Sequence, residues 1–200
     1  KIIGTFVFSA LFVGAFAQGG SWYVGGLVGF NSESDDFGFN ETRTSWSFDP
    51  EVGTFLNDQW SVGLALGLNG SSSSNDNGDV MSSSSFAPTV YGRRWWSLGE
   101  NLNLFAGLDV GFGNGSTTMY ATGPNGEDET MDNSSFGTNV NGGVAYALAP
   151  DWTLLFKFAA LGYETNTVGD NSTSRFGLAA DGNVTSNQFL FIGLYWTFMK

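Results

Sequence analysis

Side chains in this sequence alternate between apolar and small or polar types at every second position, over stretches of about ten residues. In residues 60–69 one face carries Trp60, Val62, Leu64, Leu66 and Leu68, and the other carries Ser61, Gly63, Ala65, Gly67 and Asn69. Successive side chains of a β-strand point to opposite faces, so this pattern predicts a strand with one fully apolar face. The same pattern indicates eight segments: 22–30, 44–55, 60–69, 86–96, 102–113, 136–147, 152–163 and 188–198. Most of them match the roughly 9–11 residues that a tilted strand needs to cross a bilayer.

The connections between these segments are short and long in strict alternation. Those after the second, fourth and sixth segments have four, five and four residues, and the others have 13, 16, 22 and 24. Transmembrane barrels combine short periplasmic turns with longer extracellular loops in this way. We therefore predict an all-β fold, an eight-stranded antiparallel up-and-down transmembrane β-barrel. Because the strand number is even, both mature termini should lie on the periplasmic side.

Tryptophans and acidic residues sort to opposite ends of this predicted barrel. Six of the seven tryptophans fall at the short-turn ends: Trp22, Trp60, Trp95, Trp96, Trp152 and Trp196. Indole rings favour the headgroup region of a membrane, so we predict an aromatic girdle there. The long connections hold 13 of the 19 acidic residues, opposed only by Arg43 and Arg175. We expect these connections to form long acidic loops on the extracellular side.

The composition removes several classes of chemistry. The chain has no His and no Cys, which excludes His-dependent catalytic triads, His-ligated zinc, thiol chemistry and disulfides. The formal net charge of −12 disfavours binding to nucleic acid, whose phosphates attract basic surfaces. Charged residues make up only 13% of the chain, about half of what a soluble protein carries. We predict no cofactor and no enzyme activity.

The first 17 residues read as an export signal. Lys1 precedes an apolar run, and the segment ends in a small-x-small triplet at residues 15–17. We predict a cleaved secretory signal peptide over 1–17 and a single barrel domain over 18–200. The alternative is a short membrane anchor, although this run is shorter than the roughly 20 residues that a transmembrane helix needs.

Five charged residues lie on the faces predicted to line the barrel lumen: Asp49, Glu51, Arg93, Asp109 and Lys157. An ion without a partner in a narrow lumen is costly, so we expect a paired polar network that includes Tyr91, Asn139 and Asn141. The structural interpretation is a plug, because eight strands leave room for side chains but little open channel. The functional alternative is a gate or proton path.

Other readings of these residues are weaker. A secreted soluble ligand-binding barrel would need a water-facing surface rich in charged residues, and the second face here carries Gly, Ala, Ser and Asn. Residues 75–79 loosely resemble a calcium loop but lack its downstream bidentate Glu, so we predict no metal site. In an enzyme, Asp49 and Glu51 would be the only conceivable acid–base pair.

Several stretches resemble one family when they are taken in order: 20–26, 48–56, 87–93, 104–111, 143–148, 158–163 and 192–198. Together they are similar to the small outer-membrane β-barrel proteins of the Bacteroidetes type, within the OmpA-like eight-stranded β-barrel group. The resemblance spans all eight predicted strands and fails in the loops. It implies location in the cell outer membrane of a Gram-negative bacterium, after export and insertion by the barrel-assembly machinery.

The end of the chain also resembles this group. Outer-membrane barrels share a terminal aromatic strand that is read during insertion, and here Trp196 and Phe198 match it as a C-terminal insertion signal. Met199 and Lys200 follow, whereas the usual last residue is Phe. The resemblance does not imply wall anchoring, because the separate peptidoglycan-binding domain of OmpA has no counterpart in this sequence.

The function that these features favour is structural. We predict a closed, side-chain-filled barrel in contact with outer-membrane lipid, whose long acidic loops display a surface to an extracellular partner or a larger complex. The alternative is a porin-like narrow pore for ions or small solutes.

Overall fold

The structure, a computed structural model, describes residues 20–35, 41–76, 78–121, 126–179 and 191–198. These residues form nine β-strands: β1 (Trp22–Asp35), β2 (Glu41–Asn57), β3 (Trp60–Asn75), β4 (Gly78–Ser97), β5 (Leu102–Met119), β6 (Glu129–Ala149), β7 (Trp152–Val168), β8 (Asn171–Ala179) and β9 (Phe191–Phe198). The signal peptide expected over 1–17 lies outside the described residues. No helix in the described part of the chain is long and apolar enough to cross a membrane.

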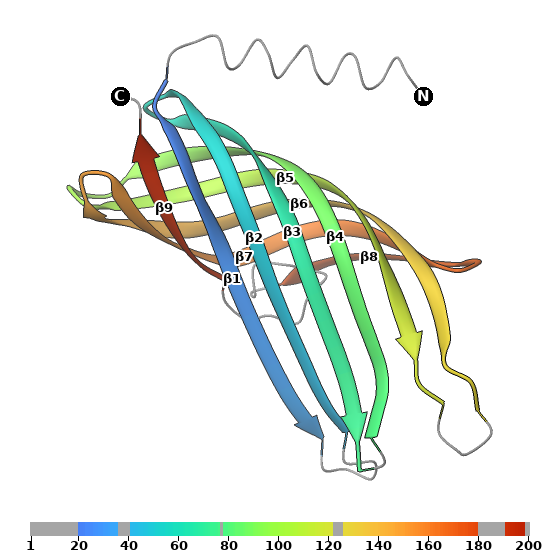
Figure 1. The fold of residues 1–200 in the computed structure, drawn as a ribbon. Coiled ribbons are helices and arrows are strands. Elements are labelled where there is room, and N and C mark those ends of the chain that lie inside the picture. Colours follow the sequence, from blue (N-terminus) through green and yellow to red (C-terminus); the bar gives the residue numbers. More distant parts are fainter. Residues whose placement is uncertain (1–19, 36–40, 77, 122–125, 180–190, 199–200) are drawn as a thin grey trace.

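Eight of the strands close into a ring of antiparallel neighbours. The order runs from β6 through β5, β4, β3, β2 and β1 to β9 and β7, and the pairing of β6 with β7 completes the circle. The expected eight-stranded antiparallel barrel is confirmed. Figure 1 shows the start of β1 and the end of β9 at the end of the ring that carries the short turns between β2 and β3, β4 and β5, and β6 and β7.

The strands continue far beyond the segments that the hydrophobic pattern marks. β4 begins at Gly78 rather than at residue 86, and β6 begins at Glu129 rather than at residue 136. These extensions are rich in Ser, Thr, Asn and Gly, so alternation of apolar residues could not reveal them. Their hairpins are joined by cross-strand hydroxyl pairs, such as Ser71 with Ser83 at 2.8 Å and Thr118 with Thr130 at 2.9 Å. Most of the described residues in the expected loops therefore form long hairpins that extend the barrel strands at the end opposite the short turns (Figure 1).

The expected loop over 164–187 is wrong in its first half. β7 runs to Val168, and after a two-residue turn β8 returns beside it as far as Ala179. Gly169 in that turn has a φ of +56°, a conformation that favours glycine. β8 and β9 both pair with β7, β8 with residues 160–168 and β9 with residues 152–157. Both strands thus lie along β7, and residues 180–190, which connect them, lie outside the described part.

The two faces of the ring separate as the alternation predicts. Large apolar side chains cover the outer surface, among them Val24, Val28, Leu64, Leu66, Leu108, Phe112, Val140, Ile192 and Leu194. The interior holds the buried core: Tyr23, Leu27, Ala65, Tyr91, Phe105, Leu155, Phe191 and Tyr195, with Phe55 and Trp95 packed against it. An apolar exterior and a filled interior are what a barrel in lipid requires, and the opposite of a soluble cup.

The tryptophans near the short turns divide between these faces. Trp60, Trp96, Trp152 and Trp196 are exposed on the outer surface, and Trp22 shares the outward face of β1 with Val24. Trp95 points inward instead. Consecutive side chains of a strand face opposite ways, so Trp95 and Trp96 cannot both contact lipid. The assignment of Trp95 to the girdle is therefore wrong.

Candidate lumen plug and extracellular cavity

The half of the lumen next to the short turns holds a chain of aromatic rings that come from five strands. The ring of Tyr23 lies 5.8 Å from that of Tyr195 and 5.3 Å from that of Phe55. Trp95 continues the chain, with its ring 5.8 Å from Phe55 and 5.3 Å from Phe105. Aromatic pairs at these distances stabilise one another beyond the area they bury. This aromatic cluster forms the floor of the barrel interior.

Glycines on neighbouring strands make room for these rings. Tyr195 pairs with Gly25 in the register, and Tyr91 pairs with Gly63. A Cβ atom on Gly63 would overlap the Tyr91 ring and the Val52 carbonyl oxygen. The recurrent glycines on the lumen face thus lie under aromatic side chains in a cylinder too narrow for two large residues at the same level.

Hydroxyl groups tie the aromatic cluster together. The Tyr91 hydroxyl donates to the Tyr23 hydroxyl at 3.1 Å, and Tyr23 donates in turn to Ser61 Oγ at 3.3 Å. Trp95 Nε1 also donates to Ser61 Oγ, at 2.9 Å. These hydrogen bonds satisfy the polar ends of three aromatic side chains that are otherwise packed against apolar neighbours.

Arg93 packs against this cluster and forms a buried ion pair. Its Nη2 donates to Glu51 Oε1 at 2.8 Å, and both side chains are at most 3% exposed. Tyr195 donates from its hydroxyl to the other oxygen of Glu51, at 2.9 Å. The guanidinium lies 4.1 Å from the centre of the Tyr91 ring. The carboxylate therefore has two donors, and the cation has one counter-ion and lies near the rings of Tyr91, Phe105 and Tyr195.

A second, looser pair stands beside the first. Lys157 Nζ lies 3.7 Å from Asp109 Oδ2, and Asn141 donates to the same oxygen at 2.6 Å. The Lys157 ammonium also lies 5.1 Å from the centre of the Phe191 ring. Asp49 lines the cavity above, and within the described strands no ion pair joins it to either cation.

The structure thus brings four of the five predicted lumen charges into two pairs and leaves Asp49 on the cavity wall. Of the expected polar neighbours, Tyr91 and Asn141 contact these pairs. Asn139 lies opposite Asp109 in the β5–β6 register, with a buried Oδ1 that has no hydrogen-bond partner. The sequence reasoning did not include Tyr23 and Tyr195. Their signal is an aromatic residue on a face otherwise made of small residues, opposite a glycine on the next strand.

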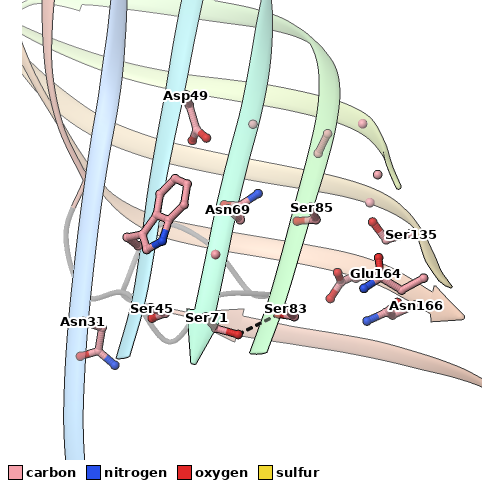
Figure 2. A pocket seen from close by; sticks show the side chains of 18 of the residues that line it. Asn31, Ser45, Asp49, Asn69, Ser71, Ser83, Ser85, Ser135, Glu164 and Asn166 are labelled. Carbon is pink, nitrogen blue, oxygen red and sulfur yellow. Dashed lines mark hydrogen bonds between the residues drawn. The ribbon is translucent and has the colours of Figure 1, made fainter. Parts of the chain in front are cut away.

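We call the aromatic cluster and the two ion pairs the plug. Between the plug and the long hairpins, the lumen holds a cavity of about 600 Å³. Hydroxyl and amide groups dominate its wall, and Figure 2 shows Asn31, Ser45, Asn69, Ser71, Ser83, Ser85, Ser135 and Asn166 around it, with Asp49 and Glu164. Its boundary next to the plug includes Asp49, Glu51, Tyr91, Asp109 and Lys157. We call this space the extracellular cavity, because it lies between the plug and the long hairpins that we expect on the extracellular side.

No group of three or more acidic residues within the described ranges is arranged to hold a metal ion. The segment that loosely resembles a calcium loop lies at the tip of the β3–β4 hairpin, where Asn75 pairs with Gly78. At the other end of the barrel, Trp196 and Phe198 of the expected insertion signal stack with their ring centres 5.1 Å apart. Their part in insertion stays a prediction.

Comparisons with known proteins agree with this architecture. Residues 3–198 match the family model described as outer membrane protein beta-barrel domain. No curated protein matches the sequence significantly. Among solved structures, the outer membrane protein OprG from Pseudomonas aeruginosa is 16% identical with a TM-score of 0.52, covering 92% of this chain and 98% of its own.

Two further solved structures are similar over nearly their whole length. Neisserial surface protein A is 16% identical with a TM-score of 0.48, over 89% of this chain and 97% of its own. Ail, the attachment invasion locus protein of Yersinia pestis, is 14% identical with a TM-score of 0.44, over 90% and 99%. At such identities the likeness to OprG concerns the fold alone. The family model, however, spans almost the entire chain, so this protein belongs to the outer membrane protein beta-barrel domain family and resides in the cell outer membrane.

Proposed function

We propose that this protein is a closed barrel that displays a polar surface outside the cell, and that it does not conduct ions or solutes. The observation that carries the proposal is the plug. The Arg93–Glu51 pair and the aromatic cluster beneath it fill the lumen between the extracellular cavity and the periplasmic end. A cavity that ends on a buried, hydrogen-bonded ion pair is a dead end for a solute.

The outer half of the molecule supports display of a surface. The long hairpins and the cavity wall present Ser, Thr, Asn and acidic side chains, a surface suited to contact with a polar partner. The ordered stretches given above support placement within the Bacteroidetes type. The proposal assigns no catalytic role to Asp49 or Glu51, since Glu51 already accepts bonds from Arg93 and Tyr195.

Conductance in planar lipid bilayers tests the proposal. The purified protein should give no channel openings at any voltage that the bilayer tolerates. A variant with Arg93→Ala and Tyr195→Ala, which shortens two side chains of the plug, should open a leak if that plug is the barrier. Deletion within 114–121, in the β5–β6 hairpin, is the matched control and should leave the barrel closed.

A narrow pore would behave differently. Steady openings of the unaltered protein, with a conductance that changes on Arg93→Ala, would contradict the closed barrel and favour the pore. Migration of folded protein that shifts on boiling should accompany each measurement, because an unfolded sample would also be silent.

A further inference from the structure

Arg94 occupies a position that neither the plug nor the extracellular cavity explains. It follows Arg93 on β4, and the alternation of the strand turns its side chain to the outer surface, where it is exposed. The residue lies close to the short turn between β4 and β5, at the level of the outward tryptophans. It is therefore a cation on the lipid-facing wall at the periplasmic end of the barrel.

Two tryptophans hold the Arg94 guanidinium. Trp60 pairs with Arg94 across β3 and β4, and its ring centre lies 5.6 Å from Arg94 Cζ. Trp96 is two residues along the same face of β4, and its ring centre lies 5.2 Å from Cζ. Guanidinium groups are attracted to indole faces at these distances. The two rings restrict where the side chain can point without occupying its hydrogen-bonding edge.

The counter-ion of Arg94 is not supplied by the part of the chain that the structure describes. The described ion pairs and side-chain hydrogen bonds of the barrel do not include Arg94. A guanidinium has five N–H donors in a planar fork, which matches the geometry of a phosphate group. On the lipid face of a barrel, an arginine costs little only near the membrane interface, which is where headgroup phosphates lie.

The wall above Arg94 suits a lipid better than a free anion. Gly92, the next residue on the same face of β4, has no side chain, and its partners in the register are Val62 and Leu108. A Cβ atom placed on Gly92 would meet no atom closer than 4.0 Å, so the outer surface at Gly92 forms a shallow depression between its neighbours. An acyl chain can lie against these apolar residues while its phosphate reaches Arg94.

We propose that Arg94, held between Trp60 and Trp96, binds the phosphate diester of a phospholipid in the periplasmic leaflet of the outer membrane. Arginine can bind a phosphate group through two parallel hydrogen bonds, and this contact is stronger and more directional than the contact that a lysine makes. The site would fix the depth and rotation of the barrel in the membrane at one point of its circumference.

Native mass spectrometry of the detergent-solubilised protein with added phosphatidylglycerol tests this site. The unaltered protein should retain one lipid, and Arg94→Gln should weaken retention about tenfold, as expected for loss of one charged hydrogen-bonded contact. Arg94→Lys should lie between the two. Trp96→Phe should weaken retention, whereas Trp196→Phe, in the same girdle but away from Arg94, should not.

Arg175→Gln, which removes one positive charge on β8 at the extracellular end, is the matched charge control and should retain the lipid. Equal retention by Arg94→Gln and the unaltered protein would overturn the proposal, and so would equal loss in Arg175→Gln. Displacement of the lipid by millimolar inorganic phosphate would overturn the assignment to a lipid. If Arg94→Gln does not fold, as judged by migration with and without boiling, Arg94→Lys and Trp96→Phe carry the test.

Discussion

Arg93 shows how much the environment of a single residue decides in this barrel. Its guanidinium is almost fully buried, and only Nη2 has a hydrogen-bond partner, the Glu51 carboxylate. Burying an ion pair costs desolvation energy comparable to the attraction between the charges, so such a pair is weak evidence for stability by itself. Removing one partner of the pair strongly destabilises the protein, because the remaining charge is then buried without compensation.

Arg93→Met should therefore destabilise the folded barrel by about 3–5 kcal/mol, because it leaves the Glu51 carboxylate without its cation. The double variant Arg93→Met with Glu51→Leu should recover most of that loss, since it removes both charges. Urea unfolding of the protein in lipid vesicles, followed by tryptophan fluorescence, measures both. Destabilisation of the double variant equal to the sum of the two single variants would show that the residues are not coupled.

The sequence predicted which residues carry charge into the lumen but not which residue meets which. Glu51 is on β2 and Arg93 is on β4, so the two meet across β3. There the small residues Ala65 and Gly63 leave room between them. Which residues stand at one level depends on the stagger of the closed ring, and no single strand contains that information. The position of Trp95 near a short turn does not decide which face of the strand it occupies. Adjacent side chains of a strand face opposite ways, so Trp95 points into the lumen when Trp96 points to the lipid.

At the scale of elements, hydrophobic contrast decides how much of a strand can be recognised from sequence. The membrane-spanning parts have an apolar face, and their presence and order were predicted. The extracellular parts of β3, β4 and β6 have polar residues on both faces, so periodicity carries no signal there. β8 had one local signal that was not used, the Gly-Asp pair at 169–170 between two runs of similar length, which is typical of a two-residue hairpin.

The glycines beneath the aromatic rings give a prediction for β3. Gly63→Ala should destabilise the barrel by about 1–3 kcal/mol, because the new methyl group would overlap the Tyr91 ring and the Val52 carbonyl oxygen. Gly92→Ala is the matched control on the neighbouring strand, with its Cβ in open space on the outer surface. Urea titration of the two variants side by side compares them. An equal loss in both would mean that strand propensity, rather than the ring above Gly63, determines the effect.

At the scale of the whole molecule, the joint that β9 forms between β1 and β7 has the shortest pairings described in the ring. β1 pairs with β2 over 14 residues, from Trp22 to Asp35, but with β9 only over seven, from Trp22 to Val28. β9 is paired with β7 over six residues. Within the described residues, the circle therefore closes through a short strand at the end that carries the short turns, with fewer paired residues on each side of β9 than between any other neighbours in the ring.

This joint should be the first part of the ring to open. Local opening needs less free energy where fewer pairs hold a strand. In hydrogen–deuterium exchange with lipid nanodiscs, peptides covering β9 should exchange before peptides covering the membrane-spanning part of β5, which is paired on both sides along its length. Simultaneous exchange of the two would indicate that the barrel opens as one unit and that the joint is not its weak point.

Arg93 and Arg94 are neighbours in the chain, yet one serves the lumen plug and the other faces lipid. Only the backbone of β4 separates these two environments. Loss or gain of a single residue in β4 near its short turn would exchange the faces that Arg93 and Arg94 occupy. Arg93 would then face the lipid and leave the plug, and the indole of Trp96 would turn toward the lumen. Length variation in this protein is therefore expected to be tolerated in the outer hairpins and excluded from the membrane-spanning stretch of each strand. In that stretch, the number of residues decides which side chains face the lumen and which face the lipid.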